Sequence, residues 1–211
     1  KEIGGDYYDV IALGGHRFGI VIADVSGKGI PAALIMTMLS GILNIEARAN
    51  ADPVRVMIKL NDTLLTKVSE NMFATVFYAV LDIDANSVEM VSAGHHEAMV
   101  YSAATAAVEN YCPRGAAIGV LKGRAFEERL EKKTAVIGAG DRLLLFTDGI
   151  SDAKAGNGQR FGMERVRAAL QNNGKKTCAQ ITEKLVSEVE AFTGGQEQSD
   201  DIAVLSIGRT A

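Results

Sequence analysis

The segment FGIVIADVSGKGIPAAL, residues 18–34, constrains the fold more than any other part of the chain. Apolar residues occupy both alternating sets of positions over 18–25, which predicts a strand buried on both faces. The strand ends in Asp24, a turn with two glycines follows, and Pro31 suits the first turn of a helix over 31–47. A carboxylate at the end of a buried strand, with a flexible turn behind it, fits two kinds of site. One is a glycine-rich cradle for a nucleotide, and the other is a metal site.

The rest of the chain divides into blocks of helices and blocks of strands. Asp52 and Pro53 predict the N-cap and first turn of a helix over 53–69, on whose apolar stripe Asn61 is expected to satisfy a local hydrogen bond. An antiparallel meander is expected at 73–83, 87–93 and 97–103, further strands at 127–136, 141–147 and 201–208, and helices at 162–172 and 177–192. Helices grouped between runs of antiparallel strands indicate an α+β layered fold and not an alternating βαβ fold.

This grouping bears on the nucleotide alternative. Gly27, Gly29 and Ala32 match the G-x-G-x-x-[GA] pattern between a strand and a helix, which is the context of a dinucleotide site. Such a site also needs a second parallel strand after the helix over 31–47. The sequence instead predicts another helix there, which disfavours a nucleotide cradle.

The metal alternative gains support from acids at the ends of other strands. Asp148, in RLLLFTDGISDA, repeats the pattern of an apolar strand, an aspartate and a glycine. Asp200 and Asp201 begin the last apolar strand, and Asp6 follows two glycines. Burying unpaired carboxylates is costly, and these acids have no arginine or lysine nearby in sequence, so as a set they indicate a cation. Oxygen ligands favour Mg²⁺ or Mn²⁺ over Zn²⁺. Any single Asp-Gly or Gly-Gly-Asp is more often a turn than a ligand, so the interpretation depends on the whole set.

Two other clusters of polar residues are given no metal role. DIDAN, residues 82–86, resembles the start of a calcium loop, but Ser87 and Ala93 replace the required glycine and glutamate, so a hairpin turn is expected. His95 and His96 are neighbours in an expected strand. Because neighbouring strand residues point to opposite faces, a metal ion shared between these two histidines is not expected.

Composition disfavours several classes of partner. A net charge of −4 over 211 residues, without a basic stripe, argues against nucleic-acid binding. The longest uncharged run, residues 29–45, is shorter than a membrane span and contains polar residues, so a buried helix and no membrane contact are expected. Cys112 and Cys178 have neither zinc-ligand spacing nor the numbers of a disulfide framework, which favours a cytoplasmic location.

Seven motifs in order give the chain a family resemblance: GGDYYDV, IADVSGKGIPAAL, FATVFYAVLD, SAGHHEAMV, LLLFTDGISDA, FG and SDDIAVLSI. They resemble bacterial metal-dependent phosphatases of the PPM (protein phosphatase 2C-like) family, in the sporulation and stress-response branch that acts on anti-anti-sigma factors. The resemblance covers essentially the whole chain. It implies an αββα sandwich of two antiparallel sheets flanked by helices. It also implies a single PPM-type domain over residues 1–211, without its first strand and without any upstream sensor domain.

The resemblance also implies roles for the acids in binding two Mn²⁺ or Mg²⁺ ions. Asp24 would bridge the two ions, and the Val25 carbonyl would be a further ligand of one of them. Asp148 and Asp200 would bind the second ion, and Asp6 would bind that ion directly or orient its waters. These four aspartates form the expected catalytic set.

Other positions depart from the family pattern or leave it ambiguous. Asp200, rather than Asp201, aligns with the family's acid. The arginine that eukaryotic relatives use to hold phosphate has no counterpart, and Lys28 is a candidate substitute; the alternative is that Lys28 is a solvated turn residue. Ser92 and His96 stand where this branch has asparagine and proline, which predicts an altered loop and not lost catalysis.

The resulting functional hypothesis is a metal-dependent phosphoserine/phosphothreonine protein phosphatase. A water bridging the two ions would attack a phosphorylated anti-anti-sigma-type protein, and the domain would be the catalytic output of a bacterial signalling protein. The alternatives are a catalytically inactive binding module of the same fold and a dinucleotide-binding oxidoreductase. The helix over 31–47 is apolar nearly all round, which predicts complete burial. Gly27 and Gly29 before this helix suggest a hinge through which a partner or sensor could move Asp24; the alternative is a plain core helix.

Overall fold

The structure is a computed structural model that describes residues 4–67, 72–196, 198 and 200–209. The contacts divide the chain into two compact units, each built from two separate stretches. The first unit contains the residues up to 96 together with 112–136, and the second contains 97–111 together with the residues from 137 onward.

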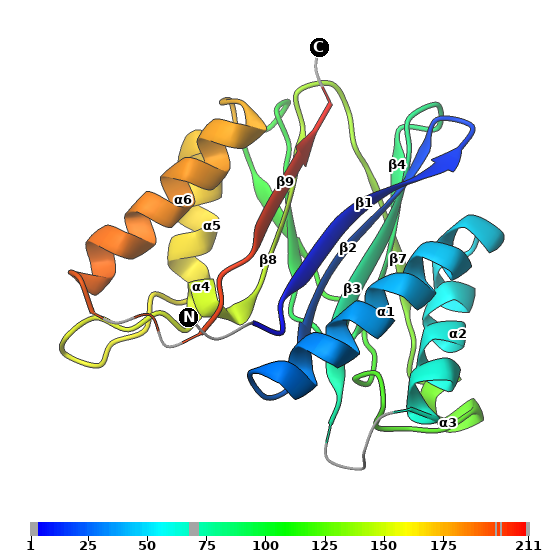
Figure 1. Ribbon diagram of the computed structural model, residues 1–211. Coiled ribbons are helices and arrows are strands. Elements are labelled where there is room, and N and C mark those ends of the chain that lie inside the picture. The colour runs from blue at the N-terminus through cyan, green and yellow to red at the C-terminus, as the bar shows by residue number, and fades with distance from the viewer. Residues whose placement is uncertain (1–3, 68–71, 197, 199, 210–211) are drawn as a thin grey trace. The chain divides into compact units, whose positions relative to one another are not determined.

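The first unit is a five-stranded antiparallel sheet with two long helices. Its strands, in spatial order, are β1 (Tyr7–Gly14), β2 (Arg17–Val25), β3 (Ala74–Asp82), β4 (Ser87–Ala93) and β7 (Lys132–Val136). Its helices are α1 (Ile30–Ala49), α2 (Pro53–Leu65) and the short α3 (Arg124–Glu127). Helix α1 packs on β1 and β2, and α2 packs on β3 and β4 (Figure 1).

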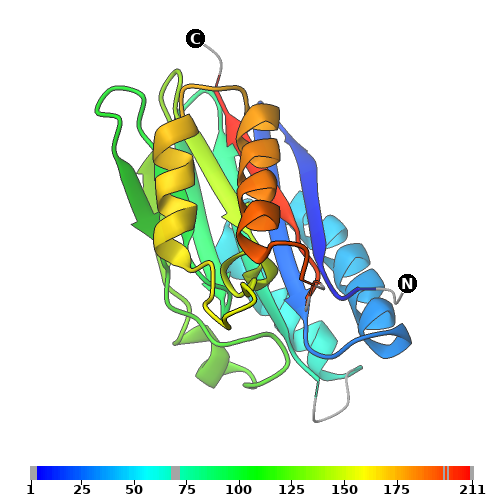
Figure 2. The ribbon, with the colours of Figure 1, turned by 90° about the vertical axis from the view of Figure 1, so that its left-hand side faces the viewer.

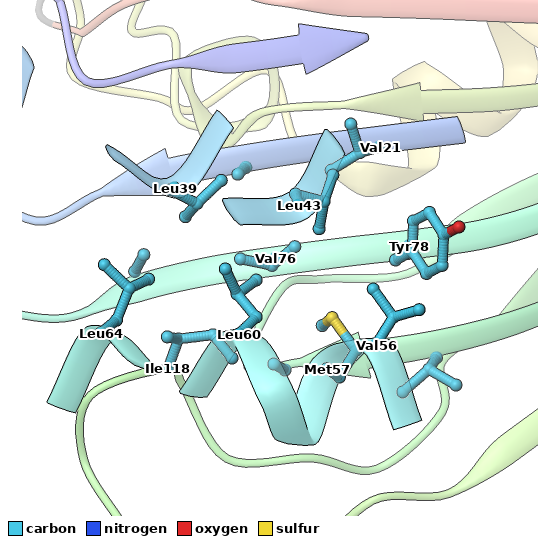
Figure 3. Packing of buried hydrophobic residues seen from close by; sticks show 14 of the residues in the cluster. Val21, Leu39, Leu43, Val56, Met57, Leu60, Leu64, Val76, Tyr78 and Ile118 are labelled. Carbon is cyan, nitrogen blue, oxygen red and sulfur yellow. The ribbon is translucent and has the colours of Figure 1, made fainter. Parts of the chain in front are cut away.

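The core of this unit lies between the sheet and its two long helices. Figure 3 shows Leu39 and Leu43 of α1 and Leu60 of α2 facing Val76 of β3, and all four side chains are fully buried. Strand β2 is buried along most of its length, as its apolar sequence predicts. Asp24 therefore stands at the end of a strand that packing holds firmly.

The burial of α1 differs from the prediction. Its buried residues recur every three or four positions (Ala32, Ile35, Leu39, Leu43 and Ala47) and form a single face. On the outer face Ile30, Leu34 and Ile45 are 70%, 65% and 69% exposed. The prediction of complete burial was wrong, because one stripe of an amphipathic helix is enough to cover the sheet. By length and composition α1 is also apolar enough to cross a membrane, a test that the core helices of globular proteins pass as well.

Helix α2 begins as predicted. The Asp52 carboxylate accepts a hydrogen bond from the Val54 N–H at 3.2 Å, and Pro53 occupies the first turn. The helix ends at Leu65, and residues 68–69 of the predicted helix lie outside the described residues. Asn61 is fully buried and its bonds are not local: its amide donates to the Leu121 carbonyl at 2.9 Å, and its oxygen accepts from the Gly119 N–H at 3.0 Å. Asn61 therefore fastens a distant loop to α2.

The second unit is a four-stranded antiparallel sheet with two helices on one face. Its strands, in spatial order, are β6 (Val108–Tyr111), β5 (Ala98–Tyr101), β8 (Arg142–Phe146) and β9 (Val204–Gly208). Its helices are α4 (Asp148–Ser151), α5 (Met163–Asn173) and α6 (Cys178–Thr193). Figure 2 shows α5 and α6 side by side over this sheet. Helix α6 begins where a helix was predicted, and Thr177 caps it in a capping box completed by Gln180.

Several predicted elements need correction. The expected meander does not form, because β3 and β4 pair in the first sheet whereas β5 pairs with β6 and β8 in the second. Of the strand expected over 127–136, only Lys132–Val136 is a strand, and Glu127 ends α3. Strands β1 and β6 and helix α4 were not predicted. Helix α1 leads into α2, and all neighbouring described strands pair antiparallel, so the expected context of a dinucleotide site is absent from the described part of the chain.

Candidate metal centre

Two of the predicted acids, Asp6 and Asp24, belong to the first unit. Asp24 lies one residue before the end of β2 and pairs in register with Thr75 of β3. The first pair between β1 and β2 joins Tyr7 to Ala23, so Asp6 immediately precedes β1 beside the position of Asp24. Both carboxylates are partly exposed. The register of β1 and β2 therefore brings these two acids to the same end of the sheet.

Gly5 allows the segment before β1 to lie close to Val25 at the end of β2. The Val25 N–H donates to the Gly5 carbonyl at 3.4 Å, and a Cβ added to Gly5 would lie 2.6 Å from the Val25 carbonyl oxygen. Any side chain at position 5 would push the backbone away from β2. The glycine before Asp6 thus allows the acid and the predicted carbonyl ligand to lie close together.

The first residue of the turn after β2, Ser26, is held by two hydrogen bonds to Phe73. The Ser26 N–H donates to the Phe73 carbonyl at 2.9 Å, and the Phe73 N–H donates to the Ser26 hydroxyl at 2.9 Å. Gly27 and Gly29 have φ angles of 91° and 75°, which favour glycine. Lys28 is exposed between them, and its role in holding phosphate stays a prediction.

The other two acids belong to the second unit. Asp148 is the first residue of α4, separated from the end of β8 by Thr147 alone, and it is exposed. The buried Thr147 joins the ends of two strands: its N–H donates to the Ala203 carbonyl at 3.0 Å, and its hydroxyl accepts from the Ala203 N–H at 2.9 Å. These bonds hold the backbone before Asp148 next to the segment that enters β9.

Gly149 completes this arrangement by allowing a close backbone approach. A Cβ added to Gly149 would lie 1.9 Å from the Asp201 carbonyl oxygen, so only glycine fits. Asp201 is partly buried and its N–H donates to the Asp200 carboxylate at 3.0 Å, whereas Asp200 is exposed. The structure therefore brings Asp148 and the Asp200–Asp201 pair to neighbouring strand ends.

His95 has a role in this region that the sequence analysis did not assign. It is only 7% exposed, its Nδ1 lies 3.0 Å from the Thr75 hydroxyl, and its carbonyl accepts from the Ser92 hydroxyl at 2.7 Å. The rings of His95 and His96 lie 4.3 Å apart, so the expectation of opposite faces was wrong. Strand β4 ends at Ala93, so strand alternation does not apply to the two histidines. His95 thus supports Thr75, the cross-strand neighbour of Asp24.

The donor set of the predicted site is made entirely of oxygen atoms. Four carboxylates and one backbone carbonyl suit hard divalent ions such as Mg²⁺ and Mn²⁺. In the ranges that the structure describes, no three His, Cys, Asp or Glu side chains form a group that could hold a metal ion. Each unit thus contributes its own pair of acids, and a joint site made from both pairs stays a prediction.

Comparison with known proteins identifies the family. A family model described as Stage II sporulation protein E (SpoIIE) matches residues 14–210. The chain belongs to the SpoIIE family. A curated relative, phosphoserine phosphatase RsbU of Bacillus subtilis (strain 168), is 32% identical over 161 residues, which are 75% of this chain and 46% of RsbU. This SpoIIE-family chain therefore spans less than half the length of that relative.

Solved structures agree with the fold of this SpoIIE-family chain. The SiaA-PP2C domain of Pseudomonas aeruginosa has a TM-score of 0.84 at 21% identity, with 97% of this chain and 80% of that chain covered. The crystal structure of RsbX in complex with magnesium has a TM-score of 0.69 at 17% identity, with 98% and 87% covered. The predicted α+β class, with two antiparallel sheets flanked by helices, is confirmed. The resemblance to PPM (2C-like) phosphatases is confirmed as well.

Proposed function

We propose that this chain is the catalytic domain of a bacterial signalling phosphatase that hydrolyses phosphoserine or phosphothreonine in a protein substrate. One observation on this SpoIIE-family chain carries the proposal. In each unit a buried strand ends close to an acid, and a glycine next to an acid in the chain packs against a backbone carbonyl of a neighbouring segment. Gly5 lies against the Val25 carbonyl, and Gly149 lies against the Asp201 carbonyl. The name of the relative RsbU, phosphoserine phosphatase, supports the reaction, and the magnesium complex of RsbX supports a divalent metal.

The chain's own residues would hold two Mn²⁺ or Mg²⁺ ions. Asp24 would bridge them, the Val25 carbonyl and Asp6 would add ligands from the first unit, and Asp148 and Asp200 would add ligands from the second. When bound, such ions lower the pKa of a water molecule and offset the charge of phosphoryl oxygens. The protein's contribution is to hold these acids at strand ends that are already fixed by backbone hydrogen bonds. The acids therefore need little rearrangement when the ions bind. The exposed ammonium of Lys28 would pair with a phosphate oxygen.

The substrate we propose is a phosphorylated anti-anti-sigma-type protein in the cytoplasm, with an upstream sensor domain controlling the activity. The name of RsbU supports phosphoserine as the reacting group, and the anti-anti-sigma class is what the resemblance of the seven motifs implies. Cys112 and Cys178 are both free thiols, which suits a reducing compartment. The net charge of −4 and the oxygen-rich site give no support to a nucleic-acid partner or to membrane contact.

The test is metal-dependent phosphate release. Purified protein is treated with a chelator and assayed with para-nitrophenyl phosphate and with a phosphorylated anti-anti-sigma factor, before and after Mn²⁺ or Mg²⁺ is added back. We expect chelation to abolish activity and either ion to restore it. Full activity in the metal-free sample would end the two-metal proposal, and no hydrolysis of either substrate with metal would favour an inactive binding module.

A further inference from the structure

A cavity of about 470 Å³ lies within the second unit, a size typical of ligand sites. One wall is the loop over residues 153–160, and the other is the last turn of α6. Lining residues that matter here are Gly149, Ala153, Lys154, Val189, Thr193 and Ile202. Gly149 also makes the close contact with the Asp201 carbonyl, and the other five have no role in the proposed metal centre.

The lining of the cavity includes residues that are close in sequence to the acids of the second unit. Gly149 follows Asp148 directly, and Ile202 comes two residues after Asp200. A substrate whose phosphate reached these acids would therefore extend its neighbouring residues toward the cavity.

The loop that forms one wall is held by its own hydrogen bonds. The Ala155 N–H donates to the Gln159 carbonyl at 2.9 Å, and the Phe161 N–H donates to the Ala153 carbonyl at 2.8 Å. At its base the Arg160 guanidinium contacts both carboxylate oxygens of Asp152, at 2.9 and 3.0 Å. Because this wall is already ordered, binding against it would cost little conformational entropy.

The lining favours an uncharged, apolar group over a second anion. Val189, Ile202 and Ala153 are apolar, and Lys154 and Glu190 carry opposite charges. The cavity also borders the C-terminal end of α6, where the Glu190 carbonyl accepts from the Gly194 N–H and the helix dipole is negative. A phosphate group is therefore better placed at the metal centre than in this cavity.

The glycines along the cavity allow a polypeptide backbone to come close. Gly156, Gly158 and Gly195 line it without side chains that would keep a main chain away. We infer that this cavity binds the segment of the protein substrate next to its phosphoserine, and takes up one apolar side chain from that segment. The inference rests on the proposed function and adds a determinant of substrate choice to it.

The test uses two tryptophan variants of α6. Thr193→Trp fills the cavity from its rim, whereas Ala191→Trp places the same side chain at an exposed position in the same turn, outside the lining. The substrates are nonapeptides with a central phosphoserine and alanine elsewhere, in which one leucine is moved from position to position. Circular dichroism and thermal unfolding check that both variants are folded.

We expect one leucine position near the phosphoserine to raise kcat/KM of the wild type about tenfold over the all-alanine peptide, as burial of a few methylene groups does. Thr193→Trp should abolish this preference and leave turnover of para-nitrophenyl phosphate unchanged, while Ala191→Trp should keep the preference. Absence of any preferred leucine position, or a preference that survives Thr193→Trp or disappears in Ala191→Trp, would overturn the inference. Failure of the wild type on para-nitrophenyl phosphate with Mn²⁺ would instead contradict the proposed function itself.

Discussion

The backbone of Gly5 lies against the carbonyl oxygen of Val25, and a Cβ added at Gly5 would sit only 2.6 Å from that oxygen. An approach this short is not tolerated, so a side chain at position 5 must move one of the two strands. Asp6 follows Gly5 directly, and Val25 follows Asp24. A displacement at this contact would therefore separate acids that we propose as ligands of the same metal centre.

Gly5→Ala should weaken Mn²⁺ binding by about tenfold or more, in the range seen when groups that support metal ligands are removed. Isothermal titration calorimetry with Mn²⁺ measures the affinity. The matched control is Gly41→Ala, in the middle of α1, where an added Cβ meets nothing within 4 Å. That variant should bind Mn²⁺ like the wild type and be more stable by about 0.5–1 kcal/mol, because alanine is the better helix former. Equal affinities in all three proteins would show that the Gly5 contact has no part in the site.

The acids should differ in importance. Asp24→Asn removes the charge that would bridge both ions, so phosphatase activity should fall by several orders of magnitude. Asp200→Asn should also be severe. Asp201→Asn should have a small effect, because the Asp201 backbone, rather than its carboxylate, makes the contact with Gly149. Steady-state kinetics with para-nitrophenyl phosphate and saturating Mn²⁺ measures the ranking, and equal damage from Asp200→Asn and Asp201→Asn would contradict the choice of Asp200.

Local signals explain the parts of the fold that the sequence predicts well. The apolar run before Asp24, the Asp52-Pro53 cap and the Thr177 capping box each depend on residues close together in the chain, and β2, α2 and α6 begin or lie where expected. The acids at strand ends were recognisable for the same reason.

Features that depend on distant partners were not predictable in this way. Strand β5 has the same strand-like sequence pattern as β3 and β4. It belongs to the other sheet because it pairs with β8, about forty residues later in the chain. Strand β1 was missed because one of its faces is largely exposed and gives no buried run. The contact of His95 with Thr75 likewise depends on where β4 ends and on how β3 pairs with its neighbours. No short sequence motif indicates either of these.

Two tyrosines should ionise at unusually high pH. Burial raises the pKa of Tyr7 to about 12, and burial raises that of Tyr78 to about 12, from an ordinary value of 10.0. Because the folded-state pKa values lie above the unfolded value, their contribution to stability is fully present below pH 10 and is lost as the pH rises toward 12. Tyrosinate absorbance should show a late step that loses amplitude in both Tyr7→Phe and Tyr78→Phe. A single titration near the ordinary pKa for every tyrosine would contradict the prediction.

The same two substitutions should affect stability differently at neutral pH. The Tyr7 hydroxyl donates to the Asp9 carboxylate at 2.9 Å and accepts from the Asn44 amide at 3.4 Å, so Tyr7→Phe should cost about 1 kcal/mol. The Tyr78 hydroxyl is buried without a hydrogen-bond partner among the described residues, so Tyr78→Phe should be neutral or stabilising. Urea unfolding followed by circular dichroism distinguishes the two outcomes.

The turn between β2 and α1 provides the last prediction, which concerns regulation. Gly27 and Gly29 have positive φ angles, and an added Cβ at either meets nothing within 4 Å, so alanine there costs backbone strain and no steric clash. Gly14→Ala is the matched control, because Gly14 has a φ of 82°, has equally open space around it and ends β1 opposite Arg17, at the other end of β2 from the turn. If the turn is a hinge that lets α1 move Asp24, Gly27→Ala and Gly29→Ala should lower Mn²⁺ affinity in calorimetry, whereas Gly14→Ala should lose similar stability and keep that affinity. Wild-type affinity and activity in both turn variants would leave α1 as a core helix without a regulatory role.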